Sequence, residues 1–233
     1  MISTNVPAAK TATPKTLQPG NTKITIRKIF LEEFPYSKAE GISYNLKLEC
    51  VGEDLGESFV GFFIDKDKES LGRHKGQVGT IRATQWAFED KIIAARDINI
   101  SRDVEIVKFL TNLAAATGCQ AWMKENDGVF GTIEEFVNAF NAEAPYKEVV
   151  LDVCLSGKEY ENKGGYTNHD LFFPKFSKEG IPFADPESDQ AARVLVFDAT
   201  KHVIAKKPAK VVESFGTEEG EGLDFAEEEE LEL

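Results

Sequence analysis

Basic and aromatic residues alternate along the segment 158–178. Lysine ammonium groups pair with phosphates and flat rings stack on bases, which is the chemistry that single-stranded nucleic acid requires of a protein surface. Phe172 and Phe173 are adjacent, and adjacent residues of a strand face opposite sides, so we expect at least one of these rings in the core. The candidate contact residues of this segment are Lys158, Tyr160, Lys163, Tyr166, Phe172, Lys175, Phe176 and Lys178.

A second basic and aromatic group precedes this segment. Residues two apart share one face of a strand, so a regular strand would present Arg82 and Trp86 together. The same pattern fits an ordinary amphipathic strand with Trp86 buried, and the sequence leaves both interpretations open. The candidate contact residues of this group are Arg73, Lys75, Arg82 and Trp86.

Motifs of the common enzyme and metal sites are missing. The chain has no G-x-x-x-x-G-K-[ST] phosphate loop and no G-x-S-x-G nucleophile elbow. Structural zinc sites use closely spaced pairs of Cys or His, whereas this chain has no C-x-x-C and its 3 histidines are widely separated. Asp65 with Asp67, and Asp97 with Asp103, resemble ordinary turn residues, so a metal-dependent nuclease is the weaker alternative. We therefore predict no enzyme activity, no metal and no cofactor.

Acidic residues are concentrated in the segment 213–233, which holds ten of the 40 in the chain and no lysine or arginine. Like charges at this density favour a disordered tail. Apolar side chains spaced among the acids indicate that the tail docks on a basic partner or competes with nucleic acid for the chain's own cations. A merely solubilising tail is the other interpretation. The candidate partner-binding residues are Asp224, Phe225, Glu228, Glu230, Leu231 and Leu233.

The rest of the chain is only mildly acidic. Residues 24–212 hold 24 basic and 30 acidic residues, which argues against tight duplex binding, since duplex-binding domains carry a strong basic excess. Residues 1–22 are polar without periodicity and predict a flexible arm. No apolar run is long enough to span a membrane, and the 3 cysteines are widely spaced, as reduced core thiols are. We therefore expect a cytoplasmic protein with no membrane contact.

The candidate contact residues need strands to hold them on one surface. Alternating apolar residues predict such strands, while Ser101 and the box Thr132–Glu135 are typical helix N-caps. The expected strands cover 23–30, 42–51, 58–64, 79–88, 91–100, 149–155, 166–174 and 193–197, with a turn at 157–165 and helices over 102–117 and from 132 to Pro145.

This order predicts a mainly β (α+β) protein built on a five-stranded barrel of the oligonucleotide-binding (OB) type. A hairpin and a helical insertion at about 66–147 would precede the last barrel strands. The expected organisation is a flexible arm over 1–22, a single OB-like nucleic-acid-binding domain over 23–212 and a disordered acidic tail over 213–233.

An OB-type core with lysines and aromatic residues, followed by an acidic C-terminal tail, resembles phage replication proteins that coat single-stranded DNA. The resemblance implies protection of single-stranded DNA during replication, recombination or repair in the host cytoplasm. It also implies that the tail recruits polymerase, helicase and other replication proteins. It leaves open whether the chain forms a homo-oligomer. A phage structural or assembly protein with a partner-binding tail is the competing hypothesis.

Overall fold

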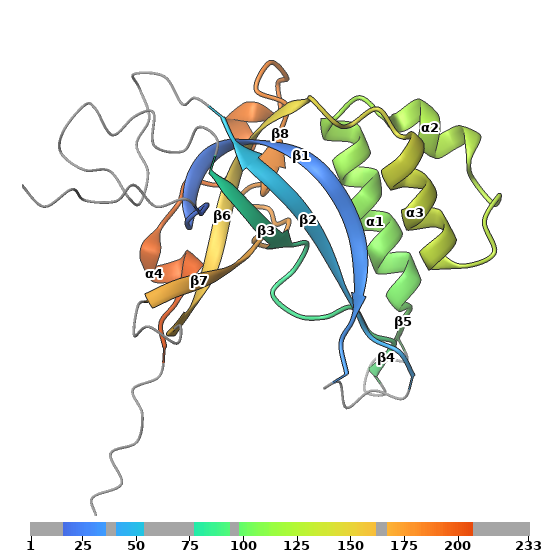
Figure 1. Cartoon of the computed structure of the whole chain (residues 1–233), viewed down its shortest axis with the longest axis horizontal. Helices are drawn as coiled ribbons and strands as arrows, with labels where there is room; N and C mark the ends of the chain where they lie inside the picture. The colour runs from blue at the N-terminus through green and yellow to red at the C-terminus, as the bar shows by residue number, and fades with distance from the viewer. Residues whose placement is uncertain (1–15, 36–40, 54–76, 94–97, 162–166, 207–233) are drawn as a thin grey trace, which may run out of the picture.

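The computed structural model describes residues 16–35, 41–53, 77–93, 98–161 and 167–206 (Figure 1). Among these residues, no helix is long and apolar enough to cross a membrane. The expected strand over 58–64, most of the N-terminal arm and the acidic tail lie outside the described residues.

Five strands close into a barrel. In order around it they are β1 (Gly20–Glu33), β2 (Tyr44–Gly52), β3 (Val78–Arg82), β7 (Thr167–Phe172) and β6 (Val150–Glu161). β6 pairs with β1 again and completes the ring. β3 and β7 are parallel, whereas the other neighbours are antiparallel. This closed mixed barrel is the OB-type α+β architecture that the sequence predicts.

Alternating apolar residues of these strands fill the barrel interior. Ile24, Leu48 and Leu151 are fully buried, because successive residues of a strand point to opposite faces of the sheet. A β-bulge near Arg27 shifts the register between β1 and β2. The three cysteines are buried free thiols, as expected.

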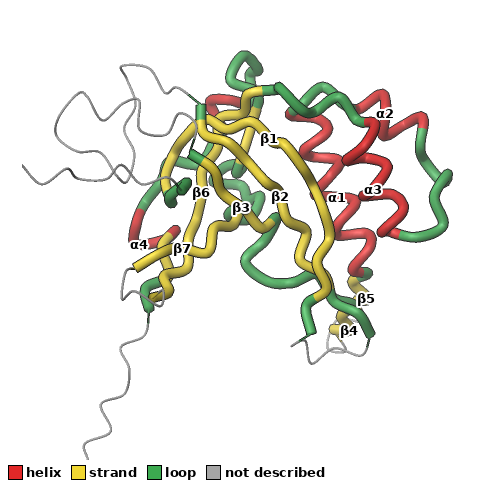
Figure 2. Tube along the Cα trace, in the orientation of Figure 1, coloured by secondary structure: helices red, strands yellow, loops and turns green. Residues whose placement is uncertain are grey.

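Three helices connect β3 to β6 and pack on one side of the barrel (Figure 2). They are α1 (Arg102–Ala116), α2 (Gln120–Glu125) and α3 (Ile133–Glu143). Ser101 caps α1 by accepting a hydrogen bond from the N–H of Val104, and Thr132 caps α3 by accepting one from the N–H of Glu135. The helical insertion before the last barrel strands is therefore confirmed.

The chain after the barrel adds short elements, two of which pair with β6. β8 (Phe183–Ala184) pairs with β6 in the antiparallel sense, and β9 (Val203–Ile204) pairs with it in the parallel sense. A 3₁₀ helix, η3 (Ala191–Arg193), and the short helix α4 (Ala199–His202) lie between them in the chain.

Several expected boundaries are wrong. β6 continues through the predicted turn at 157–165 as far as Glu161, and β3 ends at Arg82 instead of near residue 88. The expected strand 91–100 is a small hairpin of β4 (Lys91–Ile93) and β5 (Ile98–Ile100). The sequence carries no clear signal for α2, because this helix has only 6 residues and no side-chain cap.

The expected strand 193–197 is irregular. The side-chain amide of Asn21 donates to the carbonyl of Leu195 (2.8 Å) and its oxygen accepts from the N–H of Phe197 (2.7 Å). A side chain thus satisfies backbone groups that a strand would have paired in a ladder. Sequence periodicity gives no sign that a distant side chain replaces strand pairing here.

Candidate nucleic-acid interface

One line of outward-facing side chains crosses four strands of the barrel. Phe30 of β1 lies opposite Lys47 of β2, and Lys47 lies opposite Arg82 of β3. Arg82 in turn lies opposite Phe172 of β7. Lys28 belongs to the same face, because it is two residues from Phe30 in β1. We name Lys28, Phe30, Lys47, Arg82 and Phe172 the basic–aromatic row.

A cation lies over each ring of the row. The Nζ atom of Lys28 is 5.0 Å from the ring centroid of Phe30, and the guanidinium carbon of Arg82 is 6.0 Å from that of Phe172. Cations and aromatic faces attract one another at such distances. Phe30 is half-buried, whereas Phe172 is 5% exposed. Phe172 therefore supports Arg82 from beneath and presents no accessible ring for stacking.

The cations of the row are weakly engaged by the protein itself. Lys47 forms an ion pair with Glu32, and Arg82 donates to the carbonyl of Gln85 (3.0 Å). A phosphate bound by Lys47 would have to replace Glu32 in this ion pair. Lys47 and Arg82 lie on the second and third barrel strands, the face with which OB folds bind oligonucleotides.

Trp86 lies in the loop that follows β3. Its side chain is 65% exposed, so the interpretation with a buried Trp86 is wrong. Because β3 ends at Arg82, the two residues do not share one regular strand. An exposed indole is available for stacking on a base.

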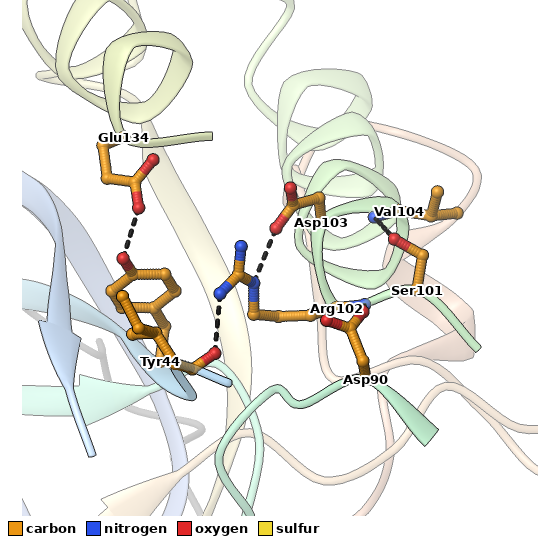
Figure 3. A network of polar contacts seen from close by, with 8 residues as sticks. Tyr44, Asp90, Ser101, Arg102, Asp103, Val104 and Glu134 are labelled. Carbon is orange, nitrogen blue, oxygen red and sulfur yellow. Dashed lines mark hydrogen bonds and ion pairs between the residues drawn. The ribbon is translucent and has the colours of Figure 1, made fainter. Parts of the chain in front are cut away.

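The loop 83–90, which carries Trp86, is named the Trp86 loop. A polar network holds its C-terminal end at Asp90 (Figure 3). Arg102, at the start of α1, places its guanidinium 4.7 Å from the ring centroid of Tyr44 and donates to the carbonyl of Ile42 (2.6 Å). Its backbone N–H donates to the carboxylate of Asp90 (2.8 Å). The start of β2, the Trp86 loop and α1 are thereby joined.

Two carboxylates complete this network. The guanidinium of Arg102 donates to Asp103 (2.7 Å), and the hydroxyl of Tyr44 donates to Glu134 of α3. That hydrogen bond is the main reason why the pKa of Tyr44 rises to about 12 and the pKa of Glu134 falls. The protonated hydroxyl and the ionised carboxylate therefore persist across the neutral range.

Two candidates from the segment 158–178 lie on the outer face of the β6–β7 hairpin. Lys158 is exposed, and the ring of Tyr160 is 43% exposed. Ser156 of β6 lies opposite Phe172 of the row. Lys158 and Tyr160 are two and four residues after Ser156, so they lie on the same face of β6. Phe173 is 1% exposed and belongs to the core, which confirms that one of the adjacent rings is a core residue.

The other described candidates of this segment follow β7 and do not belong to the row. Lys175, Phe176 and Lys178 are all exposed. Phe176 remains 39% exposed, and its ring meets Phe183 edge-on with centroids 5.3 Å apart. Its contact with a core ring anchors this segment to the barrel.

Several predicted contact residues lie outside the described residues. These are Arg73, Lys75, Lys163 and Tyr166, together with Asp224, Phe225, Glu228, Glu230, Leu231 and Leu233 of the acidic tail.

Sequence reasoning missed Lys28, Phe30 and Lys47. Lys47 occupies the polar phase of its predicted strand, and that position was the available signal. Lys28 and Phe30 continue the phase of the buried Ile24 and Ile26, so regular alternation would place them in the core. The bulge near Arg27 reverses the alternation within β1, so the sequence alone does not show that Lys28 and Phe30 share a face with Lys47.

No group of three or more His, Cys, Asp or Glu side chains in the described part of the chain is placed to hold a metal ion. Comparisons with protein-family models, with curated proteins and with solved structures find no significant match to this chain. The candidate interface therefore rests on the geometry of the barrel and its side chains.

Proposed function

We propose that this protein binds single-stranded DNA across the basic–aromatic row. The observation that supports this best is the position of the row, which crosses the second and third strands of an OB-type barrel. Trp86, in the loop after β3, and Tyr160, in β6, add exposed rings on which bases could stack.

The row combines two kinds of contact. Lys28, Lys47 and Arg82 supply positive charge for phosphates, which dominate the affinity of proteins for nucleic acids. Phe30 and Trp86 supply ring faces, and a stacked base contributes about 1–3 kcal/mol per ring. Bases inside a duplex are stacked on one another, so these rings favour a single strand.

The resemblance to phage proteins extends the proposal to a biological role. The protein would coat and protect single-stranded DNA during replication, recombination or repair. The acidic tail 213–233 would recruit replication proteins such as polymerase and helicase, and would compete with DNA for the cations of the row. Its ten acidic residues support that competition.

Fluorescence anisotropy with the full chain tests the binding proposal. A labelled dT oligonucleotide and a duplex of equal length are titrated at several salt concentrations. We expect tighter binding to the single strand and a steep loss of affinity with salt. If Lys28, Lys47, Arg82 and Lys158 each pair with one phosphate, the slope of log K against log salt should be about −3.

The other outcomes separate the alternatives. Equal binding to both DNA forms would leave only a general charge effect and contradict the proposal. Absence of binding, both by the full chain and after deletion of residues 213–233, would favour the assembly protein. Cleavage of DNA that requires a divalent metal and stops with EDTA would identify a nuclease.

A further inference from the structure

A cleft of about 280 Å³ opens where β3 and β7 separate. In the described residues, the two strands pair only through Ile81 with Leu171 and Arg82 with Phe172. The preceding residues of each strand diverge, and residues 16–18 lie along β3 there. We name this cleft the seam pocket. Its polar and aromatic lining consists of Thr16, Gln18, Thr80, Tyr160, Asn168, His169 and Asp170.

The segment 16–19 is firmly held as one wall of the seam pocket. The N–H of Leu17 donates to the carbonyl of Val78 (3.0 Å), and the Leu17 side chain is 3% exposed. Gly79 and Gly157 leave room for this segment, since a Cβ atom at either position would lie within 3 Å of Leu17 or Pro19. A wall held in this way is preformed, which lowers the cost of binding.

A second contact links this wall to the hairpin. Nδ1 of His169 lies 3.2 Å from the side-chain oxygen of Gln18. Burial lowers the pKa of His169, while the nearby Glu159 acts in the opposite direction. The Gln18 oxygen only accepts hydrogen bonds, so this contact has Nδ1–H of His169 as its donor. Both walls of the pocket are therefore fixed before a ligand arrives.

The mouth of the pocket carries the groups that an unpaired base needs. Tyr160 offers a ring that is 43% exposed, and Asn168 lies directly opposite it in the hairpin. Asp170 is the diagonal neighbour of Tyr160 on the same face, within reach of a shared ligand. Proteins that read single-stranded bases combine a stacking ring with hydrogen bonds to the base edge.

The carboxylate of Asp170 determines which base fits. An ionised carboxylate only accepts hydrogen bonds, so it pairs best with an edge that carries two adjacent donors. Guanine has such an edge, formed by its ring N1–H and its exocyclic N2 amino group. Adenine and thymine each lack one of these donors at that edge.

The seam pocket also continues the surface of the row. Thr80 and Asp170 are two residues before Arg82 and Phe172 in their strands, so they face the same side of the barrel. Lys158 lies opposite Asp170 and can pair with the phosphate of a nucleotide held there. A strand that crosses the row can therefore insert one base without leaving the protein surface.

We propose that the seam pocket binds an unpaired guanine and gives the protein a preference for guanine-containing single strands. This inference rests on the proposed function. It adds a base-reading site made by Tyr160, Asn168 and Asp170.

The test compares labelled dT oligonucleotides that carry regularly spaced guanine, hypoxanthine or adenine. Anisotropy is measured with the full chain in a lithium buffer that disfavours guanine quadruplexes. We expect guanine to be preferred over adenine by about fivefold or more, as for other bidentate base contacts. Hypoxanthine lacks the N2 amino group and should lose most of this preference.

Variants assign the preference to the pocket. Asp170→Asn should abolish the preference, measured as the ratio of the affinities for the guanine and adenine oligonucleotides. The matched control is Asp189→Asn, which removes the same charge from an exposed residue that does not line the pocket, and it should retain the preference. Tyr160→Ala should weaken binding to the guanine oligonucleotide more than binding to the hypoxanthine or adenine oligonucleotide.

The result separates this inference from the proposed function. If no single strand binds, the proposed function fails. If dT binds but guanine and hypoxanthine are bound equally, or if Asp170→Asn keeps the preference, then the guanine pocket is wrong and the general interface stands.

Discussion

Trp86 offers the most direct test of base stacking at a single residue. Trp86→Ala should weaken binding to a dT oligonucleotide by about fivefold or more, because one stacked base contributes about 1–3 kcal/mol. The free energy of unfolding should change by less than about 0.5 kcal/mol, as is usual at exposed positions. Anisotropy and denaturant unfolding measure the two quantities on the same variant.

Val129→Ala is the matched control for Trp86. Val129 is 61% exposed and lies in the loop between α2 and α3, outside the barrel face. Its truncation should leave the affinity for DNA unchanged. A Trp86 variant that binds as tightly as the unchanged protein would remove the indole from the proposed interface.

Tyr44 and Glu134 form a hydrogen bond that should respond to pH. The pKa of Glu134 is lowered from 4.5, so the stability it contributes is lost as the pH falls through its folded-state pKa. The pKa of Tyr44 is raised from 10.0 to about 12, so its contribution is lost as the pH rises toward that value. The bond therefore acts fully between about pH 5 and pH 10.

Tyr44→Phe should lower the free energy of unfolding by about 1–3 kcal/mol at neutral pH, the range for hydrogen bonds to charged groups. The deficit should shrink in acid and again in strong alkali. Urea unfolding across this pH range measures it, and Tyr160→Phe at the exposed hairpin should show no such profile. A deficit that stays constant from acid to neutral pH would contradict the assignment of Glu134 as the ionised partner.

At the scale of elements, the segment 16–19 is a wedge against the barrel. A Cβ atom on Gly157 would lie 2.4 Å from Cγ of Pro19. Gly157→Ala should therefore destabilise the protein by about 1–3 kcal/mol, as overpacking does. Gly131→Ala is the control because its Cβ would come no closer than 3.6 Å to another atom. Denaturant unfolding that ranks both variants equally would show that the wedge does not matter.

The sequence predicts those elements whose apolar pattern or helix cap is contained in their own residues. The apolar alternation of β1 and β2 and the caps at Ser101 and Thr132 lie in the local sequence, and all of these elements are present. The irregular path at 193–197 follows from hydrogen bonds to Asn21, which is far away in the chain. No local pattern contains that information.

In the candidate site too, local sequence predicts some residues, whereas others depend on contacts between distant strands. Arg82 and Tyr160 were predicted because each stands among basic or aromatic neighbours in the sequence. The row needs the pairing of four strands, including the parallel pairing of β3 with β7, and that register depends on closure of the barrel. Burial of Phe172 beneath Arg82 also depends on this register, so its supporting role could not be predicted.

For the whole molecule, the distribution of charge sets the behaviour in salt. The proposed interface gathers cations within residues 24–212, where acids exceed bases only slightly, while the segment 213–233 carries ten acids and no base. Under the proposed function, such a segment on the same chain would compete with phosphates for these cations, since a linked segment acts at high effective concentration. Its effect must weaken as salt screens both partners.

Deletion of residues 213–233 should therefore raise the affinity for a dT oligonucleotide several-fold at low salt. The gain should vanish as the salt concentration approaches about 1 M, where the screening length is only about 3 Å. A full-length variant with Glu227, Glu228, Glu229 and Glu230 changed to Gln keeps the tail length and should show an intermediate gain. If the shortened chain binds no more tightly at low salt, the tail does not occupy the interface, and the tail then either binds a partner or only solubilises the protein.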